Sequence, residues 1–287
     1  MMRRCPSLLF SLLASFLVVV SQSGFKKVAY KTGPDIMKEV VNRHKAETEL
    51  ELIKLAVVDD EGNTQVREML SVFSKNDKGE ARYLIRFLSP ADVKGITLLT
   101  NEANSTDPEQ WFYMPALGQA RKIAGDNRSG YFMGSDFTFE DLRKENTTEH
   151  SYHRLHDDEV NSKPVYVVMA APANVDIQSA TGYANRLLYI DKDTYNVLKV
   201  EFYEENNTQP IKVLEADKYA EVEVDVDADR PARLRMNNYA NDTYSVMTLL
   251  KSRLNVPVDE EIFDPESLNN WTPEMDEPLL EQFNAGS

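Results

Sequence analysis

The chain has 287 residues, a formal net charge of −15 and a single cysteine, Cys5. Binding a phosphate backbone needs concentrated Lys and Arg, so this charge disfavours nucleic acid as a partner. One cysteine excludes a disulfide framework and a cysteine-based metal site, and the length suits one β-rich domain.

The N-terminus is typical of a secretory signal peptide, predicted over residues 1–23. Two arginines precede an apolar stretch over residues 8–20, which is shorter than the roughly 20 residues that span a bilayer comfortably. Small residues before Gly24 predict cleavage near Ser23/Gly24. The sequence therefore predicts an exported protein that acts outside the cytoplasm.

Residues 34–45 form the clearest predicted helix. Pro34 suits a first helical position, and Asp35 complements the positive end of the helix dipole. The apolar stripe of this helix, at helical spacing, consists of Ile36, Met37, Val40 and Val41. We expect this amphipathic helix to cover an apolar surface.

Alternation of apolar and polar residues predicts strands along most of the remaining chain. The candidate strands are residues 47–59, 65–75, 82–88, 150–160, 165–170, 184–190, 197–203, 211–227, 232–241 and 243–255. About 10–11 strands are too many for a small flat sheet. We therefore predict a mainly β fold with some helix, built on a single curved antiparallel sheet that forms a partial barrel.

The C-terminal part is predicted to be less regular. Residues 257–268 favour a short helix, and the acidic, proline-bearing tail from Asn269 is expected to be mobile. One domain is therefore expected over residues 24–268, followed by the tail over residues 269–287.

Two polar patterns are candidates for a metal site. His150, His153 and His156 are spaced by three, which on a strand puts neighbours on opposite faces and disfavours zinc. Five alternating carboxylates share one face of a predicted strand: Glu221, Glu223, Asp225, Asp227 and Asp229. They either bind calcium or, as the missing glycine turn favours, keep that face solvated. We expect no metal and no cofactor.

A third pattern is a candidate for nucleophilic chemistry. Ser135 and Asp136 lie in a glycine-flanked loop, where a serine hydroxyl is a candidate nucleophile. A hydrolase also needs a positioned base, which the sequence does not show.

Residues 87–142 are richest in aromatic and methionine side chains, which are adaptable at apolar binding surfaces. Two motifs in this segment carry a family resemblance, Trp-x-Tyr-x-Pro-Ala-Leu and Gly-Ser-Asp-Phe-x-x-Glu-Asp. Their signature positions are Trp111, Tyr113, Pro115, Gly134, Ser135, Asp136, Phe137 and Asp141. The pattern resembles the outer-membrane lipoprotein-sorting protein family, a branch of the LolA-like periplasmic proteins.

The resemblance implies a half-open, incomplete β-barrel of the LolA/LolB type, with helices covering its concave face. Proteins of this kind hold the acyl chains of a lipid or lipoprotein in that cavity. Some relatives resemble partners of RND-type (MMPL-like) exporters of the inner membrane. The resemblance makes the helix at residues 34–45 a lid or plug, and it carries over no catalytic residue.

Strand parity and the aromatic segment predict the lining of the cavity, on the assumption that each strand keeps its register. The expected strand residues are Tyr83, Ile85, Phe87, Leu198, Val200, Phe202, Leu234, Met236, Val246 and Leu250. The expected residues near the mouth are Trp111, Met114, Phe132 and Met133.

Water penalises an exposed acyl chain by about 0.8 kcal/mol per methylene, so a carrier must hide that surface. We therefore predict a non-enzymatic periplasmic carrier or chaperone that transfers a lipid or lipoprotein toward an outer-membrane acceptor. Two alternatives stay open. One is an accessory subunit of an RND/MMPL-type envelope exporter that carries no lipid itself. The other is a secreted hydrolase that uses Ser135 or the histidines.

Overall fold

The structure is a computed structural model. It describes residues 30–43, 46–102, 108–219 and 231–284. The chain divides into two compact units, Met1–Lys31 and Thr32–Ser287, and the second contains all the helices and strands given below. The predicted signal peptide lies outside the described residues. Among the described residues, no helix is both long enough and apolar enough to cross a membrane.

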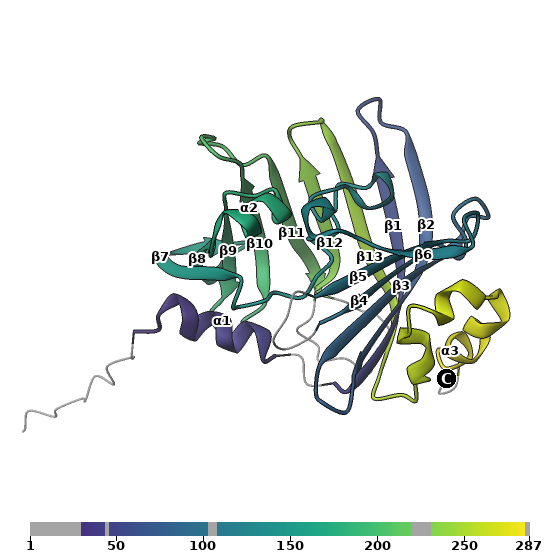
Figure 1. Ribbon diagram of the computed structural model, residues 1–287. Helices are drawn as coiled ribbons and strands as arrows, with labels where there is room; N and C mark the ends of the chain where they lie inside the picture. The colour runs from purple at the N-terminus through teal and green to yellow at the C-terminus, as the bar shows by residue number, and fades with distance from the viewer. Residues whose placement is uncertain (1–29, 44–45, 103–107, 220–230, 285–287) are drawn as a thin grey trace, which may run out of the picture. The chain divides into compact units, whose positions relative to one another are not determined.

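Thirteen strands of the described residues form one antiparallel sheet (Figure 1). They are β1 (Thr48–Val58), β2 (Thr64–Lys75), β3 (Ala81–Ser89), β4 (Thr97–Asn101), β5 (Glu109–Met114), β6 (Gln119–Lys122), β7 (His150–Val160), β8 (Lys163–Pro172), β9 (Asn185–Asp191), β10 (Val197–Tyr203), β11 (Lys212–Tyr219), β12 (Pro231–Asn238) and β13 (Thr243–Leu254). Their order across the sheet is β6-β5-β4-β3-β2-β1-β13-β12-β11-β10-β9-β8-β7. Because β6 and β7 do not pair with each other, the sheet stays open and these strands are its edges. Figure 1 shows that the sheet is curved.

The strand number exceeds the expected ten or eleven. The additional strands are β4, β5 and β6, which lie in residues 97–122. Consecutive apolar residues such as Leu98 and Leu99 hide the alternation in this stretch, because both faces of β4 are buried. The predicted strand over residues 211–227 begins as expected, but residues 220–230 lie outside the described part of the chain.

In the described part of the chain, three α-helices and five 3-10 helices accompany the sheet. They are α1 (Gly33–Val41), η1 (Gly125–Asn127), η2 (Phe132–Gly134), α2 (Val175–Thr181), η3 (Glu260–Phe263), η4 (Ser267–Asn270), η5 (Pro273–Asp276) and α3 (Glu277–Glu281). Helix α1 is shorter than predicted; Thr32 and Asp35 form a capping box at its start, and Asn42 is its C-cap. The single helix predicted over residues 257–268 is replaced by η3 and the start of η4, with the helix breaker Pro265 between them.

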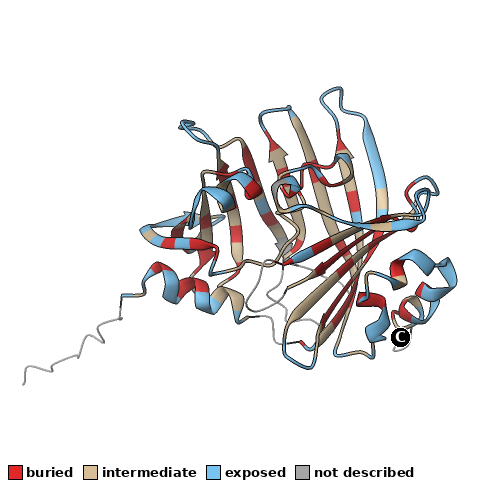
Figure 2. Ribbon diagram, viewed as in Figure 1, coloured by how far each residue is buried: buried red, intermediate tan, exposed pale blue. Residues whose placement is uncertain are grey.

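The two edge strands are consecutive in the sequence, so the segment that joins them must travel from one edge of the sheet to the other. We call this segment, residues 123–149, the connector. Its side chains pack with α1 against one face of the sheet, which we call the inner face. Figure 2 shows buried positions on strands across the sheet. The connector and α1 are therefore the elements that occupy the side where a ligand was expected.

The opposite face of β1–β6, the outer face, is covered by the C-terminal segment, which we define as residues 256–284. Leu279 and Phe283 are buried against this face together with Phe263. Arg86 of β3 forms a buried ion pair with Asp276. The tail from Asn269 was expected to be mobile; in its described part, apolar side chains pack into an outer core.

Candidate functional site

The inner face of β7–β12 carries an apolar floor beneath α1. Ile36 and Met37 of the helix are 0% exposed, and Val40 packs beside them. The sheet residues beneath are Val168, Ala170, Leu188, Ile190, Val200, Phe202 and Met236. These side chains form a continuous apolar layer whose cover is a short amphipathic helix.

The start of α1 lies very close to the backbone of edge strand β7. A Cβ atom on Gly33 would be 2.5 Å from the carbonyl oxygen of Tyr152. Only glycine leaves room for this approach. At its other end, Arg43 donates a hydrogen bond to the Asn196 side chain in the turn between β9 and β10. The helix is thus attached at both ends to the floor that it covers.

The connector fills the inner face of β1–β5. The Phe132 ring stacks on Phe87 of β3 with centroids 5.5 Å apart. Phe139 meets the rings of Phe112 and Phe132 edge to face, at 5.8 Å and 5.7 Å. The side chains that surround them include Leu55, Met69 and Leu98. This half of the inner face is therefore packed by the protein's own aromatic side chains.

The two aspartates of the signature anchor the connector to β11, β12 and β13. The Asp136 carboxylate accepts hydrogen bonds from Asn238 at 3.1 Å and from Ser245 at 2.7 Å. Thr243 donates to the same carboxylate. The buried Lys212 ammonium lies 2.7 Å from Asp141. The signature positions Asp136 and Asp141 thus hold the connector on the sheet.

Lys212 is a buried residue of the site that no pattern in the sequence predicts. Its ammonium also donates to the carbonyl oxygen of Asp136 at 3.0 Å. It lies 5.2 Å from the ring centroids of both Tyr183 and Phe202. An isolated lysine on a strand usually reaches solvent, and only the crossing connector makes this one an internal counterion.

A second buried charge cluster holds the end of the connector. Arg143 pairs with Glu140 at 2.9 Å and with Glu149 at 3.0 Å, and it lies 3.8 Å from Glu102. Burial raises the pKa of Glu102 to about 7, although the Arg143 charge opposes this shift. Glu102 is therefore only partly ionised near neutral pH.

A third cluster joins the connector to β7 and β9. Arg186 binds Glu145 through two hydrogen bonds of 3.1 Å and 2.9 Å. Tyr152 donates to the same carboxylate. His150 lies 3.1 Å from the Arg186 guanidinium, and burial together with this cation lowers the pKa of His150. His150 is therefore a neutral member of a structural cluster.

Most of the predicted cavity residues lie on the inner face, in one of its two apolar layers. These are Ile85, Phe87, Met114, Phe132, Met133, Val200, Phe202, Leu234 and Met236. Tyr83 contacts the Phe73 ring at 5.1 Å. Of the predicted lid residues, Ile36, Met37 and Val40 belong to the same layer, and Val41 is half-buried.

Other predicted residues lie elsewhere. Trp111 and Tyr113 face outward and pack beneath the C-terminal segment, while Met114 of the same strand faces inward. Val246 lies between Ser245 and Met247, which both face inward, so Val246 points outward. The predicted parity of β13 started from Val246, whose side chain lies on the outer face.

Two β-bulges explain the remaining differences. Strand β10 shifts register against β9 between Val197 and Lys199, so Leu198 packs outward beside Val165. Strand β13 shifts against β1 where Leu250 has no partner residue. A bulge inserts one residue and moves the following side chains to the opposite face.

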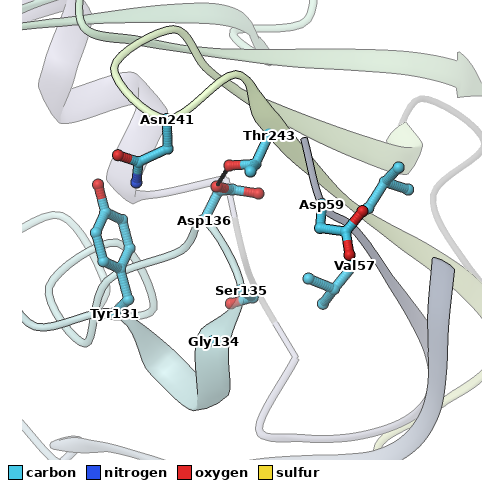
Figure 3. Close-up of a pocket in the computed structure, with 9 residues that line it drawn as sticks. Val57, Asp59, Tyr131, Gly134, Ser135, Asp136, Asn241 and Thr243 are labelled. Carbon is cyan, nitrogen blue, oxygen red and sulfur yellow. Dashed lines mark hydrogen bonds between the residues drawn. The ribbon is translucent and has the colours of Figure 1, made fainter. Parts of the chain in front are cut away.

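A small pocket opens where the end of β1, the start of β13 and the turn at residues 131–136, which we call the signature turn, meet; we call it the rim pocket (Figure 3). Its volume is about 170 Å³, and it is lined by Val57, Val58, Asp59, Tyr131, Gly134, Ser135, Asp136, Asn241 and Thr243. A second, more polar pocket of about 380 Å³ lies beside β5 and β6, lined by Pro108, Gln110, Lys122, Ile123, Ala124, Gly125 and Arg128.

Ser135 takes part in the signature turn. Its hydroxyl donates to the Phe132 carbonyl oxygen at 2.7 Å and accepts from the Phe137 amide at 3.4 Å. Gly134 precedes it with a φ of +71°, which favours glycine. The serine hydroxyl is therefore engaged in closing the turn.

Of the other signature residues, Phe137 is buried beneath α1, whereas Pro115 lies in the exposed turn after β5.

The candidate metal ligands do not assemble in the described residues, which contain no group of three or more His, Cys, Asp or Glu able to hold a metal ion. His153 and His156 are exposed on β7, whereas His150 is buried. The carboxylate ladder of residues 221–229 lies outside the described residues.

A protein-family model described as "Uncharacterized protein" matches residues 79–270. No curated protein matches the chain. Among solved structures, a domain from Vibrio parahaemolyticus assigned to outer membrane lipoprotein sorting is 24% identical, with a TM-score of 0.74, covering 83% of this chain and 98% of its own. A DUF1329 family protein from Desulfovibrio piger is 20% identical, with a TM-score of 0.73, covering 82% and 97%.

A LolA superfamily protein from Nitrosomonas europaea is 16% identical, with a TM-score of 0.64, covering 83% of this chain and 100% of its own. At such identities, these likenesses establish a shared fold.

Proposed function

The chain belongs to the family whose model matches residues 79–270, and we propose that it carries a lipid or lipoprotein by its acyl chains. Its fold is LolA-like. The observation that carries the proposal is the apolar floor beneath α1. There, a layer of buried sheet residues is covered by a separate helix.

The energetics of an acyl chain fit this floor. Each methylene removed from water contributes about 0.8 kcal/mol, so even a partly buried chain gains several kcal/mol. The chain would replace the side chains of Ile36 and Met37, which now cover Val200 and Phe202. Because one apolar cover replaces another, the floor would stay dry both with and without cargo.

Helix α1 is the element best suited to move. It meets the floor through Ile36, Met37 and Val40 and through the hydrogen bond from Arg43 to Asn196. The connector instead carries buried ionic anchors at Asp141 and Arg143. Breaking a buried ion pair costs about 3–5 kcal/mol, so the connector would remain in place while α1 opens.

The sequence and one structural relative support a direction of transfer. The predicted signal peptide supports a location in the periplasm, and the Vibrio parahaemolyticus domain is described as an outer membrane lipoprotein-sorting domain. We therefore propose delivery from an inner-membrane donor, such as an RND/MMPL-type exporter, to an outer-membrane acceptor.

One observation favours a second candidate function. The inner face is occupied by the protein's own side chains, with Phe132 and Phe139 packed against the sheet. A protein whose inner face stays filled would serve as an accessory subunit of an envelope exporter without carrying lipid.

The two candidates differ in what the purified protein contains. The experiment is to purify the protein from its native envelope, extract bound lipid and identify it by mass spectrometry. Uptake of a fluorescent fatty acid is then measured on the delipidated protein. A carrier yields a reproducible lipid and saturable uptake. An empty protein without uptake, recovered together with an exporter, would support the accessory subunit instead.

A further inference from the structure

We propose that the rim pocket binds an ammonium group, and that the headgroup of the carried lipid supplies it. The inference rests on the proposed function only for the source of the ammonium group. The cation preference itself comes from the charges and the aromatic wall of the pocket.

The two carboxylates that line the rim pocket accept hydrogen bonds from neutral side-chain donors. Asp136 is 4% exposed, and the side-chain donors to its carboxylate are the neutral groups of Asn238, Thr243 and Ser245. Asp59 accepts hydrogen bonds from backbone amides and from the Asn63 side chain. These hydrogen bonds lower the pKa of Asp59. Neutral donors stabilise a carboxylate without cancelling its charge.

Two cations reach the signature turn, and one of them, Lys212, is already in an ion pair. Lys212 pairs with Asp141 and donates to the backbone carbonyl of Asp136. Arg67 donates to the Met133 carbonyl oxygen and interacts electrostatically with Asp92. Counting both cations against the carboxylates of Asp59, Asp136 and Asp141, one net negative charge remains at the pocket. The pocket therefore favours a positively charged ligand.

The wall opposite Asp59 suits an organic cation. Tyr131 is 44% exposed, and Figure 3 shows its ring beside Asn241, with the Asp136 carboxylate between this pair and Asp59. The Lys212 ammonium already lies 5.5 Å from the centroid of this ring, so a ligand ammonium would contact the ring from its exposed side. The volume of about 170 Å³ suits a headgroup and excludes a whole lipid.

The test follows the side-chain and amide resonances of the full chain by nuclear magnetic resonance during titration with ethanolamine. We expect saturable shifts at Tyr131 and Asn241. Asp59→Asn and Tyr131→Leu should each weaken binding by about two- to fivefold. Asp60→Asn is the matched control, because it removes the same charge from the same turn at a residue that does not line the pocket. It should leave the affinity unchanged.

A second arm identifies the source of the ammonium group. Phosphatidylethanolamine and phosphatidylglycerol are compared in identical detergent micelles. Stronger shifts at Tyr131 with phosphatidylethanolamine, lost in Asp59→Asn, support the lipid headgroup. Binding of ethanolamine without any lipid preference overturns the headgroup as the source.

Absence of ethanolamine binding, equal weakening in Asp60→Asn, or saturation by calcium at the same residues overturns the ammonium site. If the protein binds ethanolamine but no acyl chain, the carrier proposal fails and the ammonium site stands.

Discussion

Lys212 is the residue whose charge most directly links the connector to the sheet. It is 1% exposed, yet it carries an ammonium group on a strand otherwise directed into an apolar core. The Asp141 carboxylate and the surrounding aromatic rings replace its hydration. An internal cation of this kind stabilises the protein only while its partner is present.

Lys212→Met should therefore lower the free energy of unfolding by about 3–5 kcal/mol, because it leaves Asp141 buried without its counterion. Urea denaturation followed by circular dichroism measures the change. The double variant Lys212→Met/Asp141→Leu should recover part of the loss. Lys199→Met, on the more exposed ion pair with Glu201, is the control and should cost less than 1 kcal/mol. Equal losses at both lysines would contradict the account.

The ionisation of Glu102 makes the stability of the folded protein depend on pH, with a sign that follows from its raised pKa. Its pKa is about 7 in the folded protein and 4.5 in the reference state, so the folded protein binds more protons between these values. Stability contributed by protonated Glu102 is therefore present at low pH and lost as the pH rises toward 7 and above.

Glu102→Gln should accordingly stabilise the protein at pH 8 relative to the wild type, by up to about 3 kcal/mol, and have little effect at pH 4. The difference between the two proteins, measured by denaturation at both pH values, isolates this group from other titrating residues. A difference that is the same at pH 4 and pH 8 would show that Glu102 ionises normally.

At the scale of the element, α1 and the connector cover the same face by different means. The helix contributes apolar side chains on one stripe, whereas the connector adds buried ion pairs and a carboxylate held by three side-chain donors. From this difference we infer that α1 moves and that the connector stays in place.

Gly33→Ala tests the movement of α1. The new methyl group would meet the Tyr152 carbonyl oxygen at 2.5 Å, so the start of the helix must shift away from β7. We expect faster uptake of a fluorescent fatty acid in stopped-flow measurements, with a folded sheet by circular dichroism. Lys38→Ala, on the exposed side of the helix, is the control. Unchanged uptake in a folded Gly33→Ala protein would argue against α1 as the lid.

The C-terminal segment depends on its own buried ion pair. Asp276→Ala would leave Arg86 uncompensated, although Arg86 also donates to Thr97 and lies over the Trp271 ring. We expect a loss of about 3–5 kcal/mol in unfolding free energy and earlier proteolysis within residues 256–284. Glu274→Gln, on the same 3-10 helix and exposed, should behave like the wild type. Similar digestion of both variants would count against this role.

At the scale of the molecule, the sequence predicts the fold well and the site only in part. Period-two alternation identified the long strands, because each has one buried face. The alternation was lost where both faces are buried, as around Leu98 and Leu99 of β4. The bulge at Leu198 reversed its predicted face, since register depends on the partner strand.

The sequence alone also does not predict the long-range contacts of the site. Asp136 and Asp141 were recognised as signature residues, but their partners lie on β11–β13, about 70 to 110 residues further along. Trp111 was assigned to the cavity because it is aromatic, whereas the C-terminal segment gives the outer face a core of its own. Residue type predicts burial but not the layer in which a side chain is buried.

The most direct measurement is photocrosslinking with a fatty acid that carries a diazirine along its chain, followed by mass spectrometric mapping of the adducts. The account predicts adducts on α1 and on β8–β10, including Met37 and Phe202, which unlabelled fatty acid competes away. Adducts confined to the outer face, or labelling that is not competed, would contradict it.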